Sequence, residues 1–598
     1  MPHRCRGAQS ARLGRRSRHT ARAKEPVRKR SGVRADAGGR STRMSWFDDR
    51  PWLKTLGRTE PDGLSESTTL ADFAATVREH GDVRAYAYYG HDVTYAELDR
   101  RTDAFAAYLV ESGIRPGDAV GIYLQNSPHF LIATYGVWKA GAVVVPLNPM
   151  YRDELAHVFA DADVKGLVVS KALYLMRVKE YAESVPTVVL VDDLDWAENG
   201  PEAVFGAFRD LPEVPLPDFR TVMEERLDAD FAPVEVTPGD AALIGYTSGT
   251  SGRSKGAKLT HATLSSNSRM ATRNASLGPG AGVVSLAPLF HITGFNCQLV
   301  AGVAGAATLV LNHRFDPGSF LELLRREKPA FMAGPATVYT AMMAHPQFGA
   351  DAFDSFTSIM SGGAPLPEGL VKRFEEKTGH YIGQGYGLTE TCAQCVTVPR
   401  GLRAPVDPES GNLSTGLPQA DAMVRILDDA GNPLGPREVG EVCVSGPMIA
   451  AEYINNPEAT ASSLPGGELH TGDVGFMDED GWVFIVDRKK DMINASGFKV
   501  WPREVEDVLY THPAVQEGAV VGVPDEYRGE TVVAYVTLQP GAEATGEEII
   551  AHCRAHLASY KAPSEVRIVG ELPKTSSGKI LRRTVRAEAT SAREKAAQ

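Results

Sequence analysis

Small and hydroxyl-bearing residues crowd together between Tyr246 and His261, in the sequence YTSGTSGRSKGAKLTH. Glycine permits positive φ and close approach, so backbone N–H groups and hydroxyls in such a segment can all face one anion. A flexible linker has a similar composition. Here, however, apolar residues 241–245 predict a strand before the segment, and residues 260–270 predict a helix after it. The segment therefore predicts a phosphate-binding loop. The residues expected to face the phosphate are Thr247, Ser248, Gly249, Thr250, Ser251, Gly252 and Lys255.

The spacing in this segment differs from that of the Walker phosphate loop. That loop needs a glycine, four residues of any type and then Gly-Lys followed by Ser or Thr. No such spacing starts at Gly245, Gly249 or Gly252. A different class of nucleotide site is therefore indicated.

A second glycine-rich segment, GQGYGLTET at residues 383–391, combines an aromatic ring with oxygen-bearing side chains. Its glycines would let Tyr386 lie flat as a stacking platform. Thr389 offers a hydroxyl, and Glu390 offers a carboxylate of the kind that Mg²⁺ prefers. On its own, a Thr-Glu pair could equally cap a helix.

Further segments place single ionisable side chains beside glycines or in apolar surroundings. They are PLFHITG (288–294), SGGAPL (361–366), HTGDVG (470–475), VDRKKD (486–491) and LPKTSSGKILRR (572–583). Judged by residue type alone, His291 would be a core histidine, Asp473 a turn residue and Lys579 a solvated lysine.

Taken together and in this order, these segments resemble the signature motifs of the adenylate-forming superfamily of acyl-CoA synthetases, firefly luciferases and peptide-synthetase adenylation domains. The resemblance covers about residues 50–585. It implies catalytic roles for Thr247, His291, Glu390 and Lys579, with Mg²⁺ bound by Glu390 and Thr247. The residues implied to bind ATP or coenzyme A are Thr247, Ser248, Gly249, Thr250, Ser251, Gly252, Lys255, Gly363, Ala364, Gly385, Tyr386, Gly387, Thr389, Asp473, Arg488, Lys490, Gly497 and Lys579.

The resemblance also implies finer roles. Gly363 and Ala364 would lie against the adenine, Asp473 would accept the ribose hydroxyls, and Arg488 would reach the ribose and phosphate. Lys490 matches the hinge position of the family, and Gly497 would line the pantetheine tunnel.

The implied reaction has two steps. A carboxylate attacks the α-phosphate of ATP to give acyl-adenylate and pyrophosphate, and the CoA thiol then displaces AMP. The family's acid pocket here offers Phe290, Met332, Gly334, Gly385 and Ala393, with no charge pair. A medium- or long-chain fatty acid is therefore expected.

Three alternatives stay open. One is an aromatic acid, as in 4-coumarate:CoA ligases, because GEVCVSG (440–446) resembles a segment of those enzymes. Another is an acyl group loaded onto a separate carrier protein. A luciferase-like oxygenase is disfavoured by Asn494, which stands where luciferases carry a lysine.

Alternating strand and helix patterns position these segments. Residues 94–113 predict a helix, 117–126 a strand, 131–149 a helix and strand, and 165–170 another strand. Such alternation predicts an α/β protein with βαβ units and parallel sheets. The pattern changes near residue 490 to a compact α+β unit. We expect a basic leader at 1–43, an AMP-binding domain at 44–489 and a small mobile C-terminal domain at 490–598.

The charge is unevenly distributed. The chain of 598 residues has a net charge of −12, yet its first 43 residues carry fourteen Lys and Arg against Glu25 and Asp36. The acidic remainder argues against nucleic-acid binding. The six scattered cysteines suit a reducing compartment, so a cytoplasmic protein without a membrane-spanning helix is expected. Weak peripheral membrane contact and the oligomeric state stay open.

The basic leader is expected to be disordered. It is either an organelle transit peptide or sequence upstream of a true start at Met44, and we favour the second reading. Protein lacking residues 1–43 should then keep its kinetic constants and thermal midpoint, because a disordered arm buries nothing. Native protein whose intact mass begins at Met1 would contradict the proposed start.

Overall fold

The computed structural model describes residues 33–35, 41–43, 46–64, 66–152, 154–247, 253–408, 411–495, 498–525, 528–574 and 580–597. Within the predicted leader, β1 (Val33–Ala35) and β2 (Ser41–Arg43) pair as antiparallel strands. The other residues of the leader lie outside the described part, so its predicted disorder stays a prediction.

The first large sheet has seven strands in the order β20-β10-β9-β6-β5-β7-β8. Strands β9, β6, β5, β7 and β8 run parallel, and β10 and β20 are added antiparallel at one edge. The central strands are almost wholly apolar because both faces of a parallel sheet are covered. The strands are β20 (Glu452–Tyr453), β10 (Gly256–Thr260), β9 (Ala241–Tyr246), β6 (Val143–Pro146), β5 (Ala119–Tyr123), β7 (Val164–Ser170) and β8 (Thr187–Val191).

The second large sheet has nine strands in the order β17-β16-β15-β14-β13-β11-β12-β3-β4. Its six central strands, from β15 to β3, are parallel. The strands are β17 (Leu417–Pro418), β16 (Ala393–Thr397), β15 (Ile382–Leu388), β14 (Ser358–Gly362), β13 (Phe331–Gly334), β11 (Gly282–Val284), β12 (Thr308–Val310), β3 (Arg84–Tyr88) and β4 (His91–Thr94).

Helices join the two large sheets into one core. α2 (Thr69–His80), α3 (Tyr95–Glu111) and α4 (Pro128–Lys139) pack on one another, and every residue of α4 is buried. The same buried cluster contains Tyr86 of one sheet and Val120 of the other. The remaining helices before residue 490 are α1 (Pro51–Thr55), α5 (Glu154–Asp161), α6 (Lys171–Leu173), α7 (Lys179–Ala182), α8 (Glu202–Phe205), α9 (Phe219–Glu224), α10 (His261–Ala275), α11 (Ile292–Gly294), α12 (Ala301–Ala304), α13 (Pro317–Glu327), α14 (Ala336–Ala344), α15 (Glu368–Thr378) and α16 (Pro457–Ser463).

A four-stranded antiparallel sheet follows in the chain, in the order β18-β19-β21-β22. It ends in the 3-10 turn η8 (Lys489–Asp491), which leads into the C-terminal part. Its strands are β18 (Met423–Leu427), β19 (Gly440–Ser445), β21 (Leu469–Met477) and β22 (Val483–Arg488).

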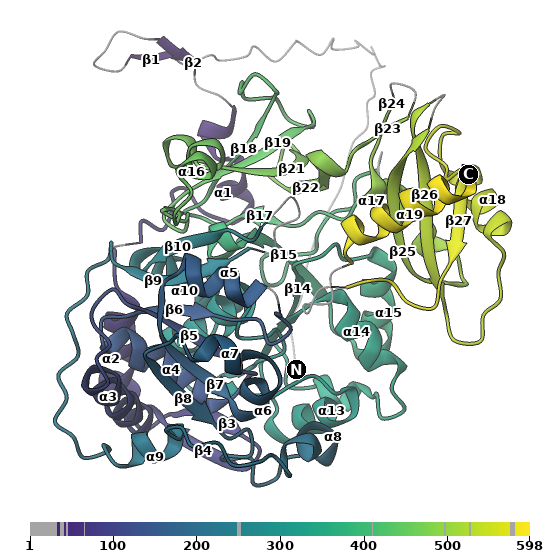
Figure 1. Ribbon diagram of the computed structural model, residues 1–598. Helices are drawn as coiled ribbons and strands as arrows, with labels where there is room; N and C mark the ends of the chain where they lie inside the picture. Colours follow the sequence, from purple (N-terminus) through teal and green to yellow (C-terminus); the bar gives the residue numbers. More distant parts are fainter. Residues whose placement is uncertain are drawn as a thin grey trace, which may run out of the picture.

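The C-terminal residues form a smaller α+β unit that stands beside the large sheets (Figure 1). Its strands are β24 (Phe498–Val500), β23 (Ile493–Ala495), β26 (Gly529–Leu538), β25 (Val515–Asp525) and β27 (Glu565–Ile568), and its helices are α17 (Pro502–Thr511), α18 (Gly546–His556) and α19 (Arg582–Ala597). Val505, Val520 and Ile549 lie in a core of its own. The predicted fold class, a parallel-rich α/β body with a smaller α+β part, is confirmed.

Local predictions agree with these elements, with one difference. The helix predicted at 94–113 is α3, which begins at a capping box between Thr94 and Glu97 and ends before Gly113 at φ 93°. The predicted loop at 246–261, however, ends earlier, because residues 256–260 form β10. Buried Ala257 and Leu259 flank the half-exposed Lys258 there, which is the period of a strand. The glycine- and hydroxyl-rich segment therefore closes a β-hairpin between β9 and β10. Among the described residues, no helix has the length and apolar character needed to cross a membrane.

Candidate functional site

A cavity of about 610 Å³ lies where the two large sheets and the four-stranded sheet meet. The ends of β13, β14 and β15 supply one wall, and β21 with η8 supplies another. Eleven of the predicted site residues line it: Thr247, Lys255, His291, Gly363, Gly385, Tyr386, Gly387, Thr389, Glu390, Arg488 and Lys490.

The other predicted site residues fall into two groups. Asp473 is buried directly behind the lining, and Ala364 is half-buried without lining the cavity. The remaining ones lie outside the described residues, so their roles stay predictions. They are Ser248, Gly249, Thr250, Ser251, Gly252, Gly497 and Lys579.

The hairpin between β9 and β10 presents Thr247 and Lys255 to the cavity. The Thr247 N–H donates to the Lys255 carbonyl at 3.0 Å, which closes the base of the loop. Two residues before Thr247, in β9, a Cβ at Gly245 would lie 2.7 Å from Cγ2 of Thr389. Only glycine therefore lets Thr389 lie directly against this hairpin.

Glu390 is held by a residue that the sequence analysis missed. Glu390 is 8% exposed, and the hydroxyl of Tyr453 donates to its Oε1 at 2.5 Å. Burial, followed by the nearby Glu390 charge, raises the pKa of Tyr453 well above its ordinary value, so the phenol keeps its proton. The ammonium of Lys255 lies 4.3 Å from the centre of the same ring, a cation–π contact. Tyr453 thus fixes both charged groups at this end of the cavity.

Tyr453 reaches this place through long-range pairing. It lies in the two-residue strand β20, where it pairs with Ala257 of β10. Nothing in the local sequence AEYINNPEAT distinguishes it from an ordinary surface tyrosine, so only the pairing of distant strands reveals it.

Asp473 joins two other residues of the cavity lining. The Tyr386 hydroxyl donates to Oδ2 at 2.7 Å, and Nε of Arg488 lies 3.0 Å from Oδ1. Burial and then the Asp473 charge raise the pKa of Tyr386 well above its usual value. Burial alone would lower the pKa of Arg488, but the surrounding acidic groups, Asp473 first among them, together outweigh burial and raise this pKa. Each carboxylate oxygen of Asp473 can still accept a further hydrogen bond, as a contact with ribose hydroxyls would require. That contact stays a prediction.

Two glycines in the lining are required by the backbone. Gly363 has φ 78°, in the left-handed region, where it turns the chain after β14. A Cβ at Gly387 would lie 1.7 Å from the carbonyl oxygen of Ala393. At Gly387, β15 bulges against β16, and that bulge directs Tyr386 and Thr389 to the cavity.

Part of the cavity lining carries no charged side chain. It includes Cys297, Met360 and the β13 residues Phe331 and Ala333, and Ala333 pairs with Met360 across the β13–β14 ladder. The predicted pocket residues Met332 and Gly334 lie outside the lining, because alternate residues of β13 point to opposite faces and Met332 is buried in another core. Phe290 also lies outside it, whereas Gly385 and Ala393 contribute as expected. His291 caps α11, accepting from the Thr293 N–H at 3.3 Å.

The strand end at β22 and η8 brings three cations to the cavity. Arg488, Lys489 and Lys490 all line it. Lys489 is paired with Asp429 at 2.8 Å, and this contact is the main reason that its pKa is raised. Burial, with Arg488 beside it, lowers the pKa of Lys490. The cavity therefore combines a cationic polar region with an uncharged apolar end, as a site for an anion linked to an apolar group would.

Known proteins are similar to this chain in sequence and in fold. The family model of the AMP-binding enzymes matches residues 73–454, and that of the AMP-binding enzyme C-terminal domain matches residues 504–579. The chain belongs to the AMP-binding enzyme family. The resemblance inferred from the motifs is thus confirmed.

Individual relatives cover most of the chain. The long-chain-fatty-acid–CoA ligase of Salmonella typhimurium is 37% identical over 545 residues, which is 88% of this chain and 95% of the relative. A feruloyl-CoA synthase of Amycolatopsis sp is 35% identical over 520 residues, or 86% and 95% of the two chains. The crystal structure of an anthranilate CoA ligase in complex with anthranoyl-AMP superposes with a TM-score of 0.80 at 25% identity, covering 90% of this chain and 99% of that one.

The contacts of Tyr453 generate a prediction. Tyr453→Phe keeps the ring beneath Lys255 but leaves Glu390 without its donor, a loss of about 1.5–3 kcal/mol for a hydrogen bond to a charged group. We expect ATP-dependent pyrophosphate release to slow roughly 10- to 100-fold, and Tyr453→Leu to be slower still. The matched control is Tyr535→Phe, whose hydroxyl accepts from Arg567 in the C-terminal unit. Equal rates in Tyr453→Phe and Tyr535→Phe would show that the hydroxyl does not position Glu390.

Proposed function

We propose that this protein is an AMP-forming acid–thiol ligase that activates a long-chain fatty acid with ATP and transfers the acyl group to coenzyme A. The observation that carries the proposal is one cavity whose lining combines the charged side chains Lys255, Glu390 and Arg488 with uncharged residues such as Phe331 and Met360. An acyl-adenylate has this division into a charged nucleotide and an apolar chain.

The proposed reaction has two balanced steps. A carboxylate oxygen of the acid attacks the α-phosphorus of ATP, and pyrophosphate leaves with the electrons of the broken P–O bond. The thiolate of CoA then attacks the acyl carbonyl, and AMP leaves. Fixed cations at the cavity, among them Lys255 and Arg488, are oriented by Tyr453 and Asp473 before substrate arrives, and such preorganised charge favours a transition state with spread negative charge.

We further propose Mg²⁺ as the metal of the first step, with Glu390 and Thr247 as its protein ligands. Both residues line the cavity, and carboxylate and hydroxyl oxygens suit a hard cation. Across the described residues, no group of three or more His, Cys, Asp or Glu could hold a metal by itself. That agrees with Mg²⁺, which is commonly bound by one or two carboxylates together with substrate phosphates and water. When bound, it would neutralise phosphate charge.

The choice of acid rests on the apolar end of the cavity and on the fatty-acid ligases among the relatives. The feruloyl-CoA synthase, at 35% identity, supports an aromatic acid as the second candidate. We propose the cytoplasm as the location, since the five described cysteines are buried free thiols, as a reducing compartment maintains.

A substrate panel tests the proposed function. Octanoate, dodecanoate, hexadecanoate, ferulate and 4-coumarate would each be incubated with ATP and Mg²⁺, with and without CoA, while pyrophosphate and thioester are measured. We expect the highest kcat/KM with the longest fatty acid, and thioester only when CoA is present. Preference for ferulate would support the aromatic alternative, and acyl-adenylate that CoA never consumes would contradict the ligase assignment.

The family resemblance also generates a prediction for Lys579. Positive charge at the α-phosphate is needed in the first step only, so Lys579→Ala should slow acyl-adenylate formation by roughly 100-fold or more. Formation of the thioester from supplied acyl-adenylate and CoA should largely survive. The two half-reactions are measured separately, and equal losses in both would refute the assigned role.

A further inference from the structure

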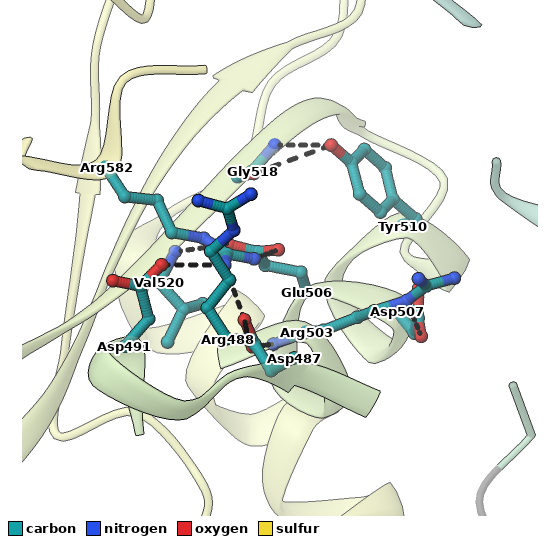
Figure 2. Close-up of polar contacts among 10 residues, drawn as sticks. All are labelled: Asp487, Arg488, Asp491, Arg503, Glu506, Asp507, Tyr510, Gly518, Val520 and Arg582. Carbon is teal, nitrogen blue, oxygen red and sulfur yellow. Dashed lines mark hydrogen bonds and ion pairs between the residues drawn. The ribbon is translucent and has the colours of Figure 1, made fainter. Parts of the chain in front are cut away.

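A buried carboxylate at the end of β22 binds three parts of the chain together. Asp487 is 5% exposed. Its Oδ1 accepts from the Arg488 N–H at 2.7 Å and from Nη1 of Arg582 at 2.8 Å, and its Oδ2 accepts from the Arg503 N–H at 2.8 Å (Figure 2). The end of β22, the start of α17 and the start of α19 therefore meet at one side chain.

Arg582 fills the space between two acidic side chains. Nε and Nη2 of its guanidinium donate to the two oxygens of Glu506, at 3.0 and 2.5 Å (Figure 2). Glu506 is 7% exposed and also accepts from the Val520 N–H at 2.9 Å. Bidentate pairing of this kind fixes the guanidinium plane, which an ammonium group does not do.

Arg582 pairs with three carboxylates, because its Nη1 also lies 3.7 Å from Oδ2 of Asp491 in η8. Its two hydrogen-bonded pairs, with Glu506 and Asp487, differ in what they connect. Its pair with Glu506 joins α19 to α17, so both partners belong to the C-terminal unit. Its pair with Asp487 reaches back to β22, on the other side of the hinge predicted at Lys490. Rotation of the C-terminal unit about that hinge would leave the Glu506 pair intact and separate Arg582 from Asp487. The Asp487 pair is thus specific to the orientation seen here.

Both ends of this connection lie next to residues with proposed roles. Arg488, which follows Asp487, lines the cavity and pairs with Asp473. Lys579, whose role is proposed above, stands three residues before Arg582 in the sequence. An ion pair at these two positions therefore ties the segment after Lys579 to the strand end that faces the nucleotide end of the cavity.

We propose that Arg582 is a positioning residue for acyl-adenylate formation, which it supports by holding the C-terminal unit against β22 through Asp487. The proposal rests on the two-step function proposed above. It extends that function by assigning a place to Arg582 and Asp487. Because rotation of the C-terminal unit would separate the pair, and because Lys579 is proposed to act in the first half-reaction only, the proposal assigns the pair to that half-reaction.

The test separates the half-reactions. Arg582→Lys keeps a positive charge but cannot bond both carboxylates in the same plane, and Asp487→Asn removes the charge from the other partner. Neither leaves the buried carboxylates without a cation, as Arg582→Gln would. We expect each variant to slow acyl-adenylate formation at least about 10-fold, because small misplacements of reacting groups are costly. Thioester formation from supplied acyl-adenylate should stay within about 3-fold of the parent protein.

The control is Arg586→Gln on the same helix. Arg586 pairs with Glu530 of β26 at 2.5 Å, entirely within the C-terminal unit, so its loss should leave the ratio of the two half-reactions unchanged. The double variant Asp487→Asn with Arg582→Lys should form acyl-adenylate no more slowly than the slower single variant. Both substitutions act on the same pair, that between Arg582 and Asp487.

Equal losses in both half-reactions, in step with a lower thermal midpoint, would show a merely structural role and overturn the proposal. Additive losses in the double variant would do the same. A parent protein that releases no acid-dependent pyrophosphate would instead refute the proposed function, so the two failures are distinguishable.

Discussion

The geometry of the cavity depends on one buried carboxylate, that of Asp473. A carboxylate that is 4% exposed is costly to bury unless donors satisfy it. Tyr386 supplies one donor from β15 of the nine-stranded sheet, and Arg488 supplies the other from β22 of the four-stranded sheet. Because Asp473 and Arg488 are also direct partners in the β21–β22 ladder, the side-chain pair and the backbone register reinforce each other. Asp473 therefore fastens the four-stranded sheet to the nine-stranded sheet beside the cavity.

The part of the cavity wall around Tyr453 is built on the same principle with different chemistry. Tyr453 stands between an anion and a cation, donating its hydroxyl to Glu390 and offering its ring face to Lys255. Asp473 lies between two donors, whereas Tyr453 lies between two charges of opposite sign. In both cases a buried side chain fixes neighbouring polar groups that would otherwise sample many rotamers. The entropy cost of ordering these groups is therefore incurred when the protein folds and not when substrate binds.

Much of this arrangement could be predicted from the sequence, because some signals are local. The capping box at Thr94 marks the start of α3, and the apolar runs of β5, β6 and β7 mark a sheet covered on both faces. The order of the glycine-rich segments identified the family. Other features depend on contacts between distant residues. Tyr453 acquires its role only when β20 pairs with β10, and Asp487, Glu506 and Arg582 come together only in the folded C-terminal unit. The sequence also does not show which face of β13 lies toward the cavity, because a shift of one residue in register exchanges Phe331 for Met332.

The strand order of the nine-stranded sheet also has a consequence for synthesis on the ribosome. Strand β3 carries the buried tyrosines Tyr86 and Tyr88, yet its parallel neighbour is β12, where Tyr86 pairs with Leu309. The intervening residues include most of the seven-stranded sheet, so the first strand of the larger sheet is translated long before its partner exists. Non-local pairing of this kind slows folding and leaves apolar edges exposed during chain growth. The nascent chain therefore passes through a stage in which β3 and β4 lack the parallel neighbour β12 that covers this edge in the folded protein.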